Sequence, residues 1–248
     1  MAPIFNLKWS ADFSVDVPLG SWGSCTGNLG GQADAPPLGS VQGFWAYPYP
    51  WQDTASENDY AVGGCYDPAT TAWVSGGQLH IKMYRDKSSP STSVHSCAMV
   101  PMAATGIKYG RFMETWRISE SAKGYKSAHL LWPVSNNGLS ETDFPEGDWD
   151  STVFCAYHNM DGKTQEWTNT GHYFSDEWTT TRLDWTPSGT VFYINELEVF
   201  KVSGGPYQPM NWILQNETAL DGEVPAVGSS AQMDISAVSV YSYTGPGL

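Results

Sequence analysis

The sequence predicts an all-β protein, a jelly-roll sandwich of two antiparallel sheets with a concave cleft on one of them. Aromatic residues make up 14% of the chain, and 25 Gly and 16 Pro supply frequent turns. Stretches that alternate between apolar and polar residues follow one another from residue 78 onwards, and no helical period of useful length interrupts them. At 248 residues, a single all-β domain over 1–248 with one core is expected.

The expected strands can be placed one by one. Residues 1–78 are rich in Gly, Pro and aromatic residues and are predicted to form mostly loops. Alternation begins at 78–84, where every second side chain is apolar, as in a half-buried strand. Further strands are predicted over 97–102, 109–118, 124–133, 153–158, 180–185, 191–195, 198–202, 210–217 and 232–241, with a polar loop over 159–170.

One carboxylate does not fit its predicted strand. Glu114 falls on the same face as Phe112, Trp116 and Ile118, whose large apolar side chains predict a core-facing surface. The alternation pattern gives no reason for a charged residue there.

The charge and the cysteines limit the expected partners. The formal net charge is −14, with only 12 Lys and Arg, so a nucleic acid is not expected to bind. Cys25, Cys65, Cys97 and Cys155 show no CxxC spacing, which disfavours a zinc site, and their setting favours one disulfide in an oxidising compartment. No run approaches the roughly 20 apolar residues that span a membrane.

The most informative segment is 140–150, which contains five carboxylates. In a strand, Glu141 and Asp143 would share one face, whereas strict alternation would turn Glu146 towards the apolar interior. Pro145 cannot donate a ladder hydrogen bond, so it belongs at an edge or a bulge. A bulge adds one residue and would return Glu146 to the face of Glu141 and Asp143.

Two carboxyl groups that flank a glycosidic bond suffice for its hydrolysis, because one protonates the leaving oxygen and the other attacks or activates water. Asp143 between the two glutamates would keep their pKa values apart. A rival register over Glu146, Asp148 and Asp150 needs no bulge but runs through Gly147, a poor strand residue. An acidic surface turn, with or without calcium, is the third interpretation.

Several segments in this order resemble glycoside hydrolase family 16, the laminarinase, lichenase and agarase clan. The run from Glu141 to Glu146 fits the E-x-D-x-x-E signature of that family, and the resemblance extends from about Val15 to Tyr243. The other matching segments, typical of an actinobacterial-type branch, are Tyr109-Gly-Arg-Phe112, Gly124-Tyr-Lys126, Leu130-Leu-Trp-Pro133, Phe144-Pro-Glu-Gly-Asp148, Asp184-Trp-Thr-Pro187 and Leu214-Gln-Asn-Glu-Thr218.

The resemblance implies a β-jelly roll with an open cleft for an extended polysaccharide and a retaining endo-glycosidase activity. The motif match implies Glu141 as the nucleophile, Asp143 as the assisting residue and Glu146 as the acid/base. A β-1,3- or mixed β-1,3-1,4-glucan is the expected substrate, and no cofactor is expected for catalysis. Two positions depart from the pattern: Thr142 replaces an apolar residue, and His129 replaces an aromatic one.

Other residues are candidates for substrate contacts. Alternation over 210–217 turns Gln215 and Glu217 to the cleft face, away from the apolar side chains of the same stretch. Trp132 is a candidate to stack on a sugar, although a buried tryptophan fits its pattern equally well. The remaining candidates are His158, Arg117 and Asp148 for substrate binding and, by resemblance, Asp234 for a structural calcium.

Three other functions remain open. They are a hydrolase of galactans such as agarose or carrageenan, a hydrolase of an envelope glycan, and a non-catalytic carbohydrate-binding jelly roll, against which the three acids argue. A monomer acting outside the cell is expected. The first residues lack the features of a signal peptide, so either that segment was removed or the protein leaves its cell by another route.

Overall fold

The computed structural model describes residues 3–22, 41–58, 60, 62–87, 94–220 and 223–246. The strands are β1 Pro3–Ala11, β2 Phe44–Ala46, β3 Gly64–Tyr66, β4 Ala72–Ser75, β5 Gln78–Arg85, β6 Val94–Pro101, β7 Gly110–Glu120, β8 Tyr125–Pro133, β9 Thr142–Asp148, β10 Thr152–His158, β11 Gln165–Tyr173, β12 Thr179–Thr186, β13 Gly189–Ile194, β14 Leu197–Val202, β15 Met210–Thr218 and β16 Ser230–Pro246. The helices are α1 Thr54–Glu57, α2 Pro68–Thr71 and the 3₁₀ helix η1 Met102–Ala104. Over the described ranges, no helix has the length and apolar character needed to cross a membrane.

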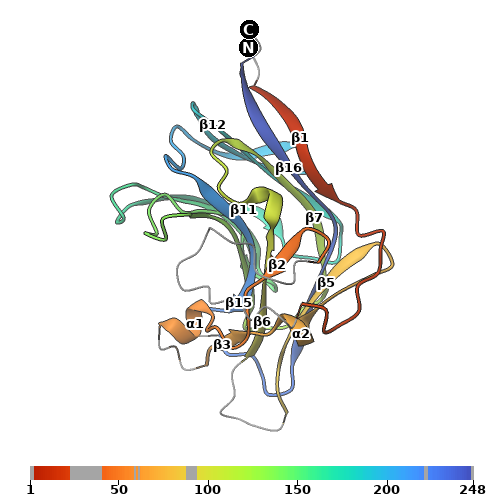
Figure 1. The fold of residues 1–248 in the computed structure, drawn as a ribbon. Helices are drawn as coiled ribbons and strands as arrows, with labels where there is room; N and C mark the ends of the chain where they lie inside the picture. The colour runs from red at the N-terminus through yellow and green to blue at the C-terminus, as the bar shows by residue number, and fades with distance from the viewer. Residues whose placement is uncertain are drawn as a thin grey trace.

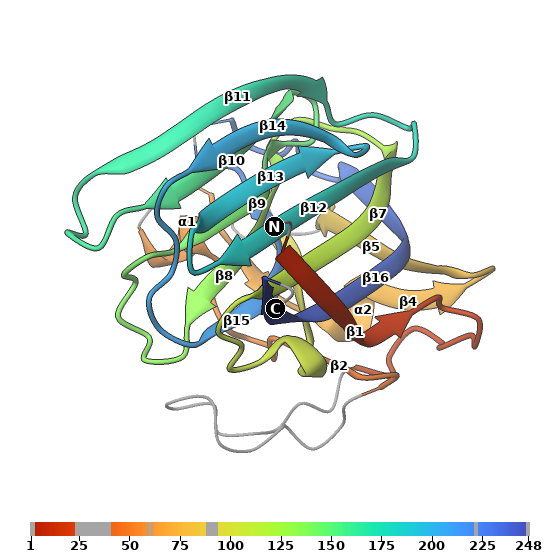
Figure 2. The ribbon, with the colours of Figure 1, turned by 90° about the horizontal axis from the view of Figure 1, so that it is seen from above.

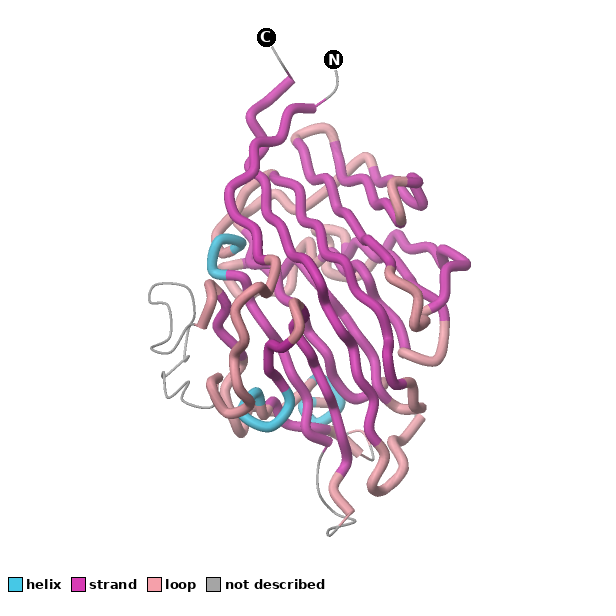
Figure 3. The backbone as a smooth tube through the Cα atoms, turned by 90° about the vertical axis from the view of Figure 1, so that its right-hand side faces the viewer, coloured by secondary structure: helices cyan, strands magenta, loops and turns pink. Residues whose placement is uncertain are grey.

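The strands form two sheets that lie face to face, as the sequence predicts (Figures 1 and 2). The site sheet, so called because it carries the predicted acids, has the order β11-β10-β9-β8-β15-β6, and the back sheet has the order β5-β16-β7-β12-β13-β14. The two sheets are continuous with each other, because β6 pairs with β15 over one part of its length and with β5 over another. The long neighbouring strands and the two chain ends at one end of the sandwich are visible in Figure 3.

Alternation along the strands builds the core between the sheets. In β7, Phe112, Glu114 and Trp116 are buried while Met113 and Thr115 are half-exposed, and in β15 the core-facing side chains include Trp212 and Leu214. Phe112 and Trp212 meet across the two sheets with ring centroids 5.5 Å apart. The prediction that Trp212 and Leu214 face the core is therefore confirmed.

The longest strands in segments that were predicted to be loops are β1 and β11. β1 pairs with β16, and β11 forms the end of the site sheet, and both expose most of their side chains. A strand that buries little of either face needs no apolar alternation, and that alternation was the basis of the strand predictions. The predicted polar loop over 159–170 was wrong for this reason from residue 165 onwards.

The expected disulfide is not supported by the described residues. Cys97 and Cys155 are buried free thiols, and no disulfide joins Cys65, Cys97 and Cys155 to one another. Burial raises the pKa of Cys97 to about 12, so this thiol is unreactive at neutral pH. Cys25 lies outside the described residues.

Glu114 is explained by a polar partner from the opposite sheet. Its Oε1 lies 2.7 Å from Nδ1 of His129 on β8, and both side chains are almost fully buried in the core. The two positions that the sequence patterns left unexplained therefore form one contact between the sheets.

The hydrogen-bond directions around His129 fix the proton on its Nε2 atom. The indole N–H of Trp149 donates to Ser127 Oγ at 2.7 Å, and the Ser127 hydroxyl donates to Oδ1 of Asn216, also at 2.7 Å. His129 Nε2 lies 3.2 Å from the same Asn216 oxygen, which only accepts, so Nε2 must carry a proton. Nδ1 and the Glu114 carboxyl group share one further proton, so a hydrogen bond joins the two side chains within the core.

Candidate active site

A β-bulge places the three predicted catalytic acids on one face. Asp143 pairs with Ala156 on β10 and Leu130 on β8, and Glu146 pairs with Phe154 and Ala128, so β9 has one extra residue between these pairs. The irregularity falls at Phe144 and Pro145, which are joined by a cis peptide bond. The predicted bulge is confirmed.

The bulge separates the acids from the apolar part of β9. The Phe144 ring lies in the core, 5.4 Å from the ring of Phe192, while the carboxylate of Glu146 is half-buried on the opposite face of the site sheet. Without the extra residue, Glu146 would point to the same side as Phe144. The rival register over Asp148 and Asp150 is therefore not needed to gather the acids.

Glu141 and Asp143 form a coupled carboxyl pair. Burial, and after it the neighbouring Asp143, raises the pKa of Glu141 to about 9. Burial and the charge of Glu146 also raise the pKa of Asp143 well above its usual value. A hydrogen bond joins the two carboxyl groups, which requires a proton between them. This hydrogen bond raises the pKa of Glu141 and lowers that of Asp143, so the shared proton lies on Glu141.

His158 lies beside this pair. Its Nε2 is 3.2 Å from Oδ2 of Asp143, and its side chain is 38% exposed. The imidazole comes from the end of β10, whose backbone also binds the pair, because the N–H of His158 donates to the carbonyl of Glu141 at 2.9 Å. His158, predicted as a substrate contact, therefore lies against Asp143 in the structure.

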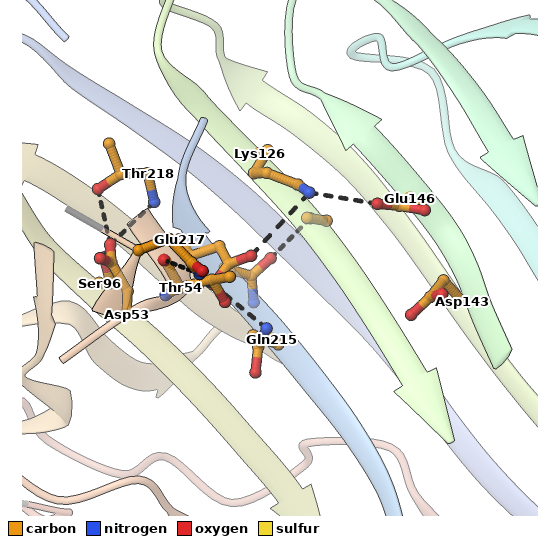
Figure 4. Close-up of polar contacts among 12 residues, drawn as sticks. Asp53, Thr54, Ser96, Lys126, Asp143, Glu146, Gln215, Glu217 and Thr218 are labelled. Atoms are coloured by element: carbon orange, nitrogen blue, oxygen red, sulfur yellow. Dashed lines mark hydrogen bonds and ion pairs between the residues drawn. The ribbon is translucent and has the colours of Figure 1, made fainter. Parts of the chain in front are cut away.

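Lys126 on β8 lies between two glutamates of neighbouring strands (Figure 4). Its ammonium is 3.2 Å from Oε1 of Glu146 and 4.0 Å from Oε1 of Glu217. Burial lowers the pKa of Lys126, but the two carboxylates outweigh burial and the pKa lies above its usual value. Lys126 is therefore charged at neutral pH.

Glu217 is buried and held by hydrogen bonds on its side away from Lys126. Its Oε2 accepts from the N–H and hydroxyl of Thr54 at 3.2 and 2.7 Å, from Gln215 at 3.2 Å and from the Tyr66 hydroxyl at 3.4 Å. Burial and the nearby Glu217 raise the pKa of Tyr66 well above its usual value, so its hydroxyl remains a donor. Gln215 and Glu217 both lie on the site face, as alternation predicted.

Asp53 fixes the segment that supports Glu217. Its Oδ1 accepts from the N–H groups of Ser56 and Gly64, and its Oδ2 accepts from the Ser96 hydroxyl and from the N–H and hydroxyl of Thr218 (Figure 4). The carboxylate is fully buried. One side chain therefore ties α1, β3, β6 and β15 together directly behind Glu217.

A pocket of about 420 Å³ lies next to Glu146 on this face. Lys126 and Asp148 supply polar walls, and Phe154 and Trp167 supply aromatic ones, with ring centroids 5.8 Å apart. The Trp167 side chain is 59% exposed, although a large apolar surface of this kind is usually buried. Asp148, a predicted substrate contact, therefore lies in the wall of a pocket that begins at Glu146.

Aromatic residues of the N-terminal part pack on the same face of the site sheet as Lys126, over β6, β8 and β15. Trp45 and Tyr47 pack with Trp132 against Leu130 and Ile213, which face away from the main core. Trp132 is half-buried, and its indole N–H donates to Oδ1 of Asn136 at 2.7 Å. Trp132 thus lies on the site face with part of its surface free for a ligand.

Two candidates lie elsewhere. Arg117 and Asp234 are on the back sheet, where the guanidinium donates to Oδ2 of Asp234 at 3.1 Å and lies over the ring of Trp178. The prediction that Arg117 contacts substrate is wrong, because this ion pair holds its side chain on the other sheet.

The carboxylate of Asp234 is surrounded by donors and not by the oxygen ligands that calcium needs. Besides Arg117, His80 and Gln232 lie 2.7 Å from its Oδ1. Burial raises the pKa of Asp234, but the hydrogen bonds from His80 and Gln232 outweigh burial and lower the pKa to about 2. The assignment of Asp234 as a calcium ligand is corrected accordingly, and no group of three or more potential metal ligands occurs in the described part of the chain.

Sequence reasoning missed Lys126 and Trp167 as site residues. Lys126 could have been found, because it lies an even number of residues before Trp132 in the same strand and so shares its face. Trp167 was assigned to a loop, and its position on β11 gave no alternation signal.

The fold is shared with solved structures, although neither a protein-family model nor a curated protein sequence matches the chain. The catalytic domain of an endo-1,3-β-glucanase (laminarinase) from Thermotoga petrophila RKU-1 matches with a TM-score of 0.69 at 16% identity, over 98% of this chain and 100% of that one. SCLam, a non-specific endo-β-1,3(4)-glucanase from family GH16, matches with a TM-score of 0.68 at 16% identity, over 97% and 93%. A glycosyl hydrolase family protein from Mycobacterium fortuitum matches with a TM-score of 0.67 at 18% identity, over 95% and 99%.

These likenesses show the fold. The chain is a β-jelly roll of the kind found in family GH16 glucanases, over nearly its whole length. They support the resemblance to glycoside hydrolase family 16 that the acidic motif and its flanking segments indicate.

Proposed function

We propose that this protein is a retaining endo-glycosidase that hydrolyses β-1,3- or mixed β-1,3-1,4-glucan. The observation that carries the proposal is the bulge in β9, which gathers Glu141, Asp143 and Glu146 on one face beside a pocket. The shared fold adds support, because SCLam has been crystallised with a 1,3-β-D-cellobiosyl-glucose at its active site.

In the first step, Glu141 passes the shared proton to Asp143 and attacks the anomeric carbon as a carboxylate while the bond to the leaving oxygen breaks. The proton of Glu146 moves to that oxygen, and Glu146 becomes a carboxylate. In the second step, water attacks the anomeric carbon, its proton moves to Glu146, and Glu141 is released as a carboxylate. Asp143 keeps its proton and donates a hydrogen bond to Glu141. No metal or other cofactor takes part, and action on an extracellular polysaccharide by a monomer is part of the proposal.

A panel of polysaccharides tests the substrate class. β-1,3-glucan and mixed β-1,3-1,4-glucan should release reducing ends, while agarose, carrageenan and envelope glycans should release none. Cleavage of a galactan or an envelope glycan alone would correct the substrate, and binding without cleavage would identify a carbohydrate-binding module. Proton NMR at early times should show the retained anomer, whereas the inverted anomer would contradict the role of Glu141.

Trp167 is expected to stack on a sugar unit next to the one that is cleaved. Replacing Trp167 by Ala should raise KM for β-glucan about 10-fold and change kcat much less, because stacking stabilises the bound polymer before and during the reaction. Tyr173→Ala is the matched control, since Tyr173 is 63% exposed on the same strand and does not line the pocket. Equal effects of the two substitutions on KM would show that the pocket is not a sugar site.

A further inference from the structure

Lys126 places a charged ammonium in a buried position, where an apolar side chain would lose less solvation free energy. It is the only Lys, Arg, Asp or Glu in β8, and the residue is 7% exposed. Taking an ammonium out of water costs several kcal/mol, and a buried ion pair rarely stabilises a fold more than apolar residues of similar size. Fold stability alone therefore does not account for a lysine at this position.

The ammonium of Lys126 lies between two glutamates that come from the strands on either side of β8. On one side of Lys126, β15 supplies Glu217, whose other oxygen is already bound by Thr54, Gln215 and Tyr66. On the other side, β9 supplies Glu146, whose Oε1 is 3.2 Å from Nζ. An ammonium held beside Glu146 can stabilise a negative charge that develops on this side chain without moving first. Electrostatic stabilisation of a transition state is strongest when the charged group is already in place.

We infer that Lys126 is a positioning residue that holds Glu146 towards the substrate and stabilises the negative charge that develops on it as its proton moves to the leaving oxygen. The inference rests on the proposed glycosidase function. In this step, the C–O bond to the leaving group breaks and the leaving oxygen takes the proton of Glu146. The new carboxylate of Glu146 then lies beside an ammonium that is already in place. Lys126 itself gives up no proton.

Substrates with different leaving groups test this role. A sugar leaving group needs the proton of Glu146, whereas 2,4-dinitrophenolate leaves without one. Lys126→Met should therefore lower kcat/KM for β-glucan about 10- to 100-fold, the effect of one hydrogen bond to a charged group. For a 2,4-dinitrophenyl β-oligoglucoside, kcat/KM, which reports the first chemical step, should fall by less than about 3-fold.

Three further variants show whether a loss of activity comes from the missing positive charge or from a disturbed fold. Lys126→Arg keeps the positive charge and should recover part of the activity on β-glucan, while Lys126→Gln should behave like Lys126→Met and replaces it if the Met variant does not fold. Lys82→Met is the matched control, because Lys82 is an ion-paired lysine on the back sheet, 2.9 Å from Glu120.

Equal losses on both substrates, a Lys126→Arg protein no better than Lys126→Met, or full activity of Lys126→Met on β-glucan would each overturn the inference. A wild-type protein that cleaves the aryl glycoside but no polysaccharide of the panel would instead overturn the proposed substrate class. Thermal unfolding of every variant shows whether its fold is intact.

Discussion

Replacing Glu141 by Gln should abolish the release of reducing ends from β-glucan, because an amide cannot form the glycosyl ester that the proposed first step requires. Replacing Glu146 by Gln should lower kcat about 10³-fold, the usual contribution of a general acid. Both proteins should still bind the polymer, since neither substitution changes the volume of the side chain. Reducing-end assays and affinity electrophoresis in a gel containing β-glucan measure the two properties.

The two glutamates should respond differently to azide. A small anion can take the place of the water that Glu146 activates, so azide should restore turnover of an aryl β-oligoglucoside by Glu146→Gln and give the β-glycosyl azide. With Glu141→Gln, azide should attack the substrate directly and give the α-glycosyl azide. Glu198→Gln, an exposed glutamate on β14, is the matched control and should keep full activity. Full activity of Glu141→Gln would contradict the assignment of the nucleophile.

Replacing Glu114 by Ala should lower the free energy of unfolding by about 1–3 kcal/mol, because it leaves the buried Nδ1 of His129 without its hydrogen-bond partner. The double substitution Glu114→Met with His129→Phe should recover most of this loss, since it removes both polar groups and fills the same space. Urea titrations followed by tryptophan fluorescence measure both proteins.

Activity on β-glucan provides a second test of the Glu114–His129 pair. Because Glu114 and His129 lie between the sheets and not on the site face, the double variant should keep its activity on β-glucan while its stability changes. A Glu114→Ala protein as stable as the wild type would show that the contact between Glu114 and His129 does not stabilise the core.

The shared face of Glu141, Asp143 and Glu146 could be predicted because the sequence pattern that indicates it is local. Alternation assigned Glu141 and Asp143, and the missing N–H of Pro145 was enough to expect the bulge that turns Glu146 to join them. Gln215 and Glu217 followed from the same rule in β15. Each of these assignments depends on neighbours within a few residues along the chain.

The rest depends on contacts between distant segments. Glu114 and His129 could each be seen as exceptions to a pattern, but only the packing of the two sheets shows that they are partners. Asp53 gave no signal for this role, because four of its five donors come from Gly64, Ser96 and Thr218, which approach it only in the folded chain. The exposed strands β1 and β11 lack an amphipathic pattern, so the sequence did not reveal them.

The hydrogen bonds of Asp53 affect the order in which parts of the site form during folding. Asp53 and Thr218 are 165 residues apart in the chain, and their hydrogen bonds lock the segment behind Glu217. During synthesis on the ribosome, the strand that carries the three acids emerges before β15, so the acids exist for a time without Glu217 and the support of Asp53. Long-range closure of this kind is slow to form. The nascent chain therefore contains Glu141, Asp143 and Glu146 early but completes the support of Lys126 only when the C-terminal strands join the sheets.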